Sequence, residues 1–130
     1  MFKKKQPPIK SLIAQGSQIA GNIKFTDGLR VDGAVVGNIR ASGDEASLLV
    51  ISEEASVVGE IHADHIIING SVKGPIHAGT MLELQPKARI EGDVNYAALE
   101  MHQGALVAGQ LRPLLGLDVK PALKLAANNG

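Results

Sequence analysis

The sequence predicts an all-β fold, a parallel β-helix of about six windings, because one short phrase recurs along the chain. The phrase has aliphatic residues at its first and fifth positions and a glycine at its centre. The central glycines are Gly21, Gly37, Gly59, Gly74, Gly92 and Gly109, which are 16, 22, 15, 18 and 17 residues apart. This period is too short for a helical-hairpin repeat and too long for a single strand. It suits one winding of about three short strands.

Inside each phrase, apolar residues alternate with polar or small ones, as expected of a strand with one buried face. Glycine takes the middle inward position, which indicates a corner with an unusual φ or no room for a side chain. Aligning the phrases gives two inward aliphatic columns: Ile19, Val35, Val57, Val72, Ile90 and Val107, and Ile23, Ile39, Ile61, Ile76, Val94 and Leu111. Each such side chain, when fully buried, contributes roughly 1.5–3 kcal/mol.

The segments that precede each phrase also repeat, in a long and a short form. The long form spans residues 49–57, 82–90 and 99–107, with a partial copy at 13–19. The short form spans 29–35 and 66–72, where the tight-turn dipeptides Asp32-Gly33 and Asn69-Gly70 save two residues. An extra loop around Ser42 to Ala46 accounts for the 22-residue interval. Six windings, from about Leu12 to Leu111, predict a rod roughly 29 Å long.

Composition narrows the class further. The 130 residues are expected to form one domain with flanking tails. Thirteen basic and thirteen acidic residues cancel, so the net charge gives no indication of nucleic-acid binding. The absence of cysteine removes disulfides and thiol chemistry from consideration. No apolar run approaches the ~20 residues of a membrane span. The first residues lack the apolar core of a signal peptide, so the cytoplasm is the expected location.

Some strings carry a more specific signal than a generic β-helix pattern. They are Leu29-Arg30-Val31-Asp32-Gly33, Leu82-Glu83-Leu84-Gln85-Pro86-Lys87-Ala88 and Leu99-Glu100-Met101-His102. On these strings the chain, over residues 11–112, resembles the bactofilins, a family of small bacterial cytoskeletal proteins. The resemblance implies a right-handed parallel β-helix that forms filaments with itself and needs neither nucleotide nor another cofactor. It also implies a scaffold at the inner face of the cytoplasmic membrane that recruits cell-wall enzymes or shape and polarity proteins.

The expected organisation is a basic, disordered tail at 1–10, a β-helical polymerisation domain at 11–112, and a tail at 113–130. A β-helix has two open ends, whose unpaired edges and exposed core favour stacking of one rod on another. The residues expected at this interface are Leu12, Ile13, Ile19, Ile23, Leu99, Met101, Val107 and Leu111. The leucines between Leu114 and Leu125 leave two alternatives open for the second tail, disorder or a partial cap.

The first five residues are the candidate membrane anchor. Met1 and Phe2 are large apolar side chains at the very tip, and Lys3, Lys4 and Lys5 follow directly. An apolar tip can enter the membrane interface, while each lysine near an anionic surface adds about 1 kcal/mol. Many copies on one filament would turn weak single attachments into firm binding. The alternative is a basic start without a role.

The search for chemistry predicts no catalytic, cofactor or metal site. His62 and His77 occupy the same place in adjacent windings, close enough to share a metal ion, but the sequence offers no third ligand. Their outward column is instead interpreted as an ordinary polar surface: Lys24, Arg40, His62, His77, Asn95 and Arg112. The acidic pairs Asp44-Glu45 and Glu53-Glu54 are interpreted as solvated turns. No glycine cluster suits a phosphate, and no nucleophile has a base beside it.

A second class of function stays open, an acyltransferase with hexapeptide repeats. Such enzymes also stack short β segments with glycine at their turns. A strict six-residue apolar period holds at Ile13, Ile19, Phe25 and Val31, then fails at Gly37. Filaments seen by negative-stain microscopy would support the scaffold, and compact trimers would support the enzyme.

Overall fold

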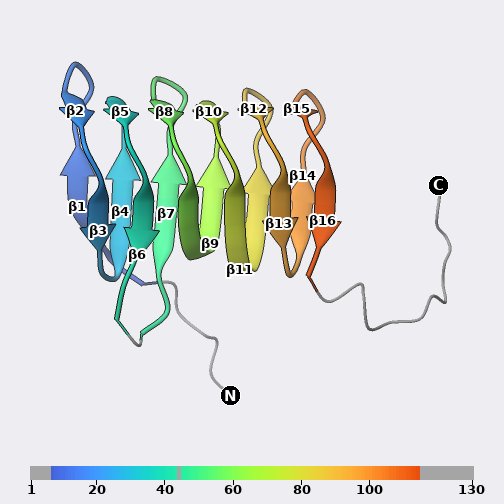
Figure 1. Ribbon diagram of the computed structural model, residues 1–130, viewed down its shortest axis with the longest axis horizontal. Coiled ribbons are helices and arrows are strands. Elements are labelled where there is room, and N and C mark those ends of the chain that lie inside the picture. The colour runs from blue at the N-terminus through green and yellow to red at the C-terminus, as the bar shows by residue number, and fades with distance from the viewer. Residues whose placement is uncertain (1–6, 44, 115–130) are drawn as a thin grey trace, which may run out of the picture.

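In the computed structural model, which describes residues 7–43 and 45–114, short strands wind into a parallel β-solenoid of about six turns (Figure 1). The first three windings contain β1 (Ile9–Ile13), β2 (Gln18–Ala20) and β3 (Ile23–Phe25); β4 (Gly28–Val31), β5 (Ala34–Val36) and β6 (Ile39–Ala41); and β7 (Leu48–Ile51), β8 (Ser56–Val58) and the first half of β9 (Ile61–Ile68). The next three contain the rest of β9, β10 (Ser71–Lys73) and the first half of β11 (Ile76–Leu84); the rest of β11, β12 (Arg89–Glu91) and β13 (Val94–Tyr96); and β14 (Leu99–Met101), β15 (Leu106–Ala108) and β16 (Leu111–Pro113).

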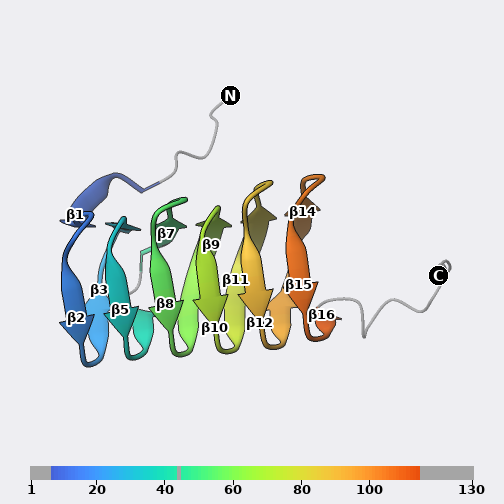
Figure 2. The same ribbon diagram turned by 90° about the horizontal axis from the view of Figure 1, so that it is seen from above.

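Every strand pairs in parallel with its equivalent in the adjacent winding. The middle strands form a six-stranded sheet in the order β15-β12-β10-β8-β5-β2, which Figure 2 shows as a row along the rod. The first and third strands of the windings belong to one ten-stranded sheet, because β9 and β11 each run from one winding into the next. The predicted all-β parallel helix of about six windings is therefore confirmed. Strand β1 begins at Ile9, two residues before the boundary expected from the sequence.

The core consists of aliphatic columns that run the length of the rod. The two predicted inward columns are confirmed: Val57 pairs with Val35 and Val72, and Ile61 pairs with Ile39 and Ile76. Two further columns come from the first strand of each winding, and their inner members are also buried: Leu29, Leu49, Ile66 and Leu82, and Val31, Ile51, Ile68 and Leu84. Repeated small layers of this kind explain why the chain contains so few aromatic residues.

The glycine at the centre of each phrase turns a corner, as predicted. Gly59, for example, has a φ of 149°, a conformation that residues with a side chain rarely adopt. A Cβ at this position would also collide with the carbonyl oxygen of Gly37 in the winding before. The corner glycines thus stack directly on one another, and their lack of a side chain sets the close approach of successive windings.

The short turns keep their glycines for a different reason from the one expected. The sequence suggested tight-turn dipeptides, yet neither Gly33 nor Gly70 is among the residues with positive φ. A Cβ on Gly33 would instead collide with the carbonyl oxygens of Ala14 and Ser17, which belong to the wider turn of the previous winding. Gly70 lies in the same way against Ser52. A narrow turn nested inside a wide one leaves no room for a side chain.

Candidate assembly interface

At the N-terminal end of the rod, the inward columns have a neighbouring winding on one side only within the described residues. Ile13, Ile19 and Ile23 are half-buried and pack against the core below them. Leu12 is 58% exposed and pairs with Arg30, so it stands in an outward column beside the open end. The alternation explains this difference, because only one of the adjacent Leu12 and Ile13 can face inward.

At the C-terminal end, the last members of the same columns are also partly uncovered. Leu99 and Val107 are half-buried, while Met101 and Leu111 are each 43% exposed. The equivalent of Leu111 in the middle of the rod, Ile61, is fully buried. The end residues named from the sequence therefore lie at the two ends of the rod with partly exposed apolar side chains, Leu12 at the rim of the first, and their role as an interface stays a prediction.

Within the described residues, the backbone donors of the last winding have no following winding to pair with. In the inner windings, the corner N–H groups donate to the following winding: Gly92 N–H to Ala108 at 2.8 Å, and Val94 N–H to Gln110 at 2.8 Å. By the same geometry, the N–H groups of Gly109 and Leu111 point along the rod toward its C-terminal end. An end of this kind can accept another strand edge and cover its apolar surface in a single contact.

Comparison with known families agrees with this geometry. A family model described as "Bactofilin: Polymer-forming cytoskeletal" matches residues 11–112. The chain belongs to the bactofilin family. This bactofilin is thus a member of a structural, polymer-forming family, which favours the cytoskeletal scaffold over the acyltransferase considered from the sequence. A search of curated proteins and a search of solved structures each gave no match.

Two of the expectations for this bactofilin concern the tails. Met1 to Lys5 lie outside the described residues, as does the tail beyond Leu114. Leu114 itself donates its N–H to the Tyr96 carbonyl at 2.6 Å and stays 44% exposed. Over 7–43 and 45–114 the bactofilin has no helix, and so none long and apolar enough to cross a membrane.

On the side of the bactofilin rod, the outward column forms as predicted. Arg40 pairs with His62, and His62 pairs with His77. The two histidine rings stack with centroids 4.2 Å apart and an interplanar angle of 14°. Burial, with the neighbouring His62, lowers the pKa of His77 below its ordinary value, which favours the uncharged ring.

Glu60 joins this histidine pair, which the sequence did not reveal. Its Oε2 lies 2.6 Å from His62 Nε2 and 3.0 Å from His77 Nε2. The hydrogen bond with His62 lowers the pKa of the Glu60 carboxyl, which keeps it ionised. A second group of similar composition lies on β11 and β14 and just after β14, where His102 Nε2 is 3.2 Å from Glu100 Oε2 and 3.4 Å from Glu83 Oε2.

Proposed function

We propose that this protein is a cytoplasmic scaffold whose rods stack end to end into filaments without nucleotide, bound metal or another cofactor. The observation that carries this proposal is the contrast in burial between equivalent positions. Ile61 is fully buried, whereas Leu111, at the same place in the last winding, is 43% exposed. Contact with the end of a second rod would give the last winding the neighbour that every inner winding has.

The physical drive for stacking is burial combined with strand pairing. Each aliphatic side chain that becomes fully buried contributes roughly 1.5–3 kcal/mol relative to full exposure, and the half-buried end residues gain a fraction of that. New backbone hydrogen bonds at the paired edge add a modest net contribution of about 1 kcal/mol each. Neither term requires hydrolysis of a nucleotide, since both arise from contact between rods that are already folded.

The test is assembly in a minimal buffer. Purified full-length protein, stripped with a chelator and freed of nucleotide, should form filaments visible by negative-stain microscopy and pelletable by ultracentrifugation. A matched sample with ATP, GTP and Mg²⁺ should form the same amount of polymer. A requirement for any of these additions would contradict the proposal.

We further propose that the filaments lie on the inner face of the cytoplasmic membrane, attached through Met1 to Lys5. The support is the sequence alone: two apolar residues at the tip followed by three lysines. One copy would bind weakly, but a filament presents many copies to the same surface. On the membrane, the filament would recruit cell-wall enzymes or shape and polarity proteins, as the family resemblance implies.

Sedimentation with anionic liposomes tests the anchor. Deletion of residues 2–5 should abolish binding while filaments still form, because these residues precede the first winding. Phe2→Glu should act similarly, and added salt should weaken binding of the unchanged chain by screening the lysines. If the truncated protein pelleted with liposomes as well as the full chain does, the anchor would have to lie elsewhere, with the leucines after Leu114 as the next candidates.

A further inference from the structure

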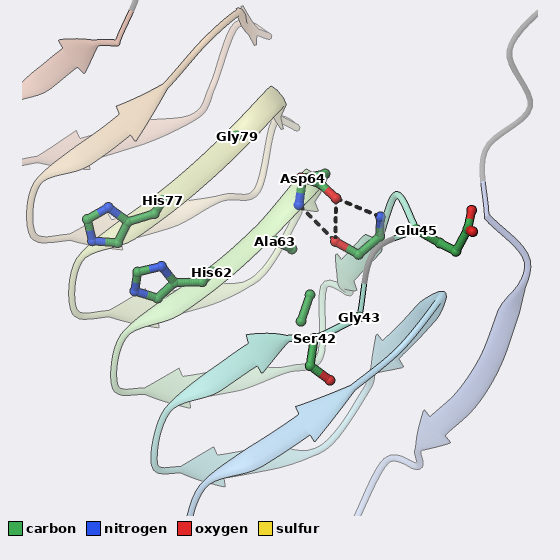
Figure 3. A pocket seen from close by; sticks show the side chains of 10 residues that line it. Ser42, Gly43, Glu45, His62, Ala63, Asp64, His77 and Gly79 are labelled. Atoms are coloured by element: carbon green, nitrogen blue, oxygen red, sulfur yellow. Dashed lines mark hydrogen bonds between the residues drawn. The ribbon is translucent and has the colours of Figure 1, made fainter.

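The side of the rod carries a cluster whose chemistry is independent of filament formation. Glu60 and His62 come from the third winding and His77 from the fourth. The Glu60 Oε2 and the two histidine Nε2 atoms all lie within 4.8 Å of one another. Figure 3 shows the two imidazole rings side by side, projecting in the same direction from adjacent strands. Two imidazoles and one carboxylate are the donor set found at many zinc sites.

The orientation of Glu60 has a cause that can be traced along the rod. The residue after each corner glycine normally accepts the backbone N–H of its equivalent in the next winding. The Asn22 side chain accepts from Asn38 N–H at 3.0 Å, and the Asn38 side chain accepts from Glu60 N–H at 2.9 Å. One more such bond joins Asp93 to Gln110 N–H at 3.1 Å.

Pro75 interrupts this ladder at two successive steps, because it has no N–H to donate to Glu60 and no side-chain acceptor for Asp93. The carboxylate of Glu60 is therefore not used by the backbone and turns toward the two histidine rings instead. Among the six windings, this is the step at which a carboxylate faces a proline and two stacked histidines, so the cluster differs from the ordinary polar column around it.

The surroundings of the cluster are partly sheltered and of mixed charge. All three side chains are half-buried. His62 and His77 line a surface hollow of about 270 Å³ that also contains Glu45 and Asp64. The Asp64 carboxylate accepts hydrogen bonds from the backbone N–H and the hydroxyl of Ser47, at 2.9 and 3.1 Å, which directs it away from the rings (Figure 3).

The charges of the neighbouring residues in the outward column affect how strongly the cluster can bind a cation. Arg40 lies beside His62 in the preceding winding, and its positive charge repels a bound cation. Lys24 lies one winding further away. Asn95 follows His77 on the other side and is uncharged. Glu60 supplies the negative charge nearest to the rings. A dication held here would be favoured by two neutral nitrogen donors and one carboxylate, and disfavoured by a single adjacent arginine.

We propose that Glu60, His62 and His77 form a binding site for a transition-metal dication of the zinc type, with the remaining coordination position open to water. Imidazole nitrogen favours zinc and its neighbours in the first transition row over magnesium and calcium, which prefer oxygen ligands. Ligands at about 2.0–2.2 Å from zinc lie about 3.3 Å apart in a tetrahedral site. Without the ion, Glu60 Oε2 lies 2.6 and 3.0 Å from the two Nε2 atoms, and the stacked rings must tilt from their interplanar angle of 14° for both lone pairs to meet at one ion.

A metal held here would join two adjacent windings through their side chains. Because the ligands come from the third and fourth windings, the ion binds only when these windings are stacked. Binding of this kind stabilises the folded rod, and the stabilisation grows with the logarithm of the metal concentration once that concentration exceeds the dissociation constant. The site lies away from the rod ends, so it does not rest on the proposed mode of assembly, and chelated protein should still polymerise.

Calorimetric titration of the chelator-stripped, full-length protein with zinc chloride tests the site. We expect about one zinc ion per chain. His62→Asn, His77→Asn and Glu60→Gln should each weaken binding at least about tenfold. These substitutions fit the fold, because asparagine and glutamine already occupy equivalent positions at Asn95 and Gln110. Cobalt in place of zinc should give the intense visible absorption of a tetrahedral site, and His77→Asn should remove it.

His102→Asn is the matched control, since it removes a histidine from a second half-exposed cluster among the described residues. It should leave the affinity and the cobalt spectrum unchanged. Zinc should raise the melting temperature of the unchanged chain but not that of His77→Asn. Absence of zinc binding by the unchanged chain would overturn the proposal. The proposal would equally be overturned if His102→Asn removed zinc binding. The same holds if His62→Asn and His77→Asn both bound zinc as tightly as the unchanged chain does.

Discussion

Ile61 and Leu111 occupy the same position in the repeat, yet the first is fully buried and the second is 43% exposed. Ile19 and Val57 differ in the same way at the other column. The sequence of the phrase is nearly the same in both cases. The difference is that an inner winding has a neighbour on each side, whereas an end winding has one.

The difference in burial between the middle and the ends shows that the same aliphatic pattern has different surroundings in the two regions. In the middle, the aliphatic columns hold successive windings of the same chain together. At the ends, the same columns are available to another chain. On the proposed mode of assembly, a protein made of equivalent layers needs no dedicated binding motif, because the columns that stabilise its own core would also contact a second copy.

The largest effect is expected from a charge placed at the two kinds of position. Ile61→Arg would bury an unpaired charge in the middle of the core, at a cost of about 5 kcal/mol or more, and should unfold the rod. Leu111→Arg or Ile19→Arg should leave the rod folded, because the side chain can reach solvent, but should yield monomers or short oligomers. Circular dichroism reports the fold, and sedimentation velocity reports the size. Normal filaments from both end variants would show that the ends are not the interface.

A smaller contrast is expected at the corners. Gly59→Ala introduces a Cβ that collides with the Gly37 carbonyl and sits at a φ of 149°, so it should cost about 3 kcal/mol or more. Gly21→Ala also has an unfavourable φ, of 135°, but no atom lies within 4 Å of the added Cβ. Its cost should be the backbone strain alone, about 1–3 kcal/mol. Urea denaturation at a fixed protein concentration measures both. Equal destabilisation would mean that stacking contributes nothing to the requirement for glycine.

The smallest effect should come from the side of the rod. Val36 is 59% exposed, more than Leu111, but it projects from the outer face of β5 and not from an open end. Val36→Lys should change stability by less than about 0.5 kcal/mol and leave the filaments unchanged. Electron microscopy of this variant tests whether assembly depends on any exposed apolar side chain or only on one at the end of the rod. A loss of filaments would point to lateral contacts between rods.

Much of the fold was predictable because its causes are local in the sequence. The alternation within each phrase identifies the inward columns, and the recurring glycine identifies the corner. The extra loop is visible as a longer interval, and the structure places it between Ala41 and Leu48. The sequence predicts Leu12 at the interface but does not tell which face it occupies, since two adjacent apolar residues do not reveal which one points inward until the register with Arg30 is known.

The Glu60 cluster was not predictable in the same way, because its cause lies along the rod and not along the chain. The column containing His62 and His77 follows from aligned phrases, but Glu60 belongs to a neighbouring column. The Glu60 carboxylate faces the histidines because the hydrogen-bond ladder between windings is interrupted at Pro75. No pattern local in the sequence describes that ladder. One signal was present: Pro75 stands where the other windings have asparagine, aspartate, glutamate or glutamine. A proline in a column of hydrogen-bonding residues marks a step where a side chain is freed for another use.

The corner glycine column also governs how such a rod can change length during evolution. The corner glycine carbonyl of each winding contacts the corner glycine of the next winding. A duplicated winding would therefore make the same contacts on both of its sides. A gene can therefore gain or lose units of about one winding, while an insertion of another size survives only where it projects outward, as between β6 and β7. Every added unit lengthens the protomer by about 4.8 Å. In a polymer, duplication would thus set the spacing at which any feature on the side of the rod recurs.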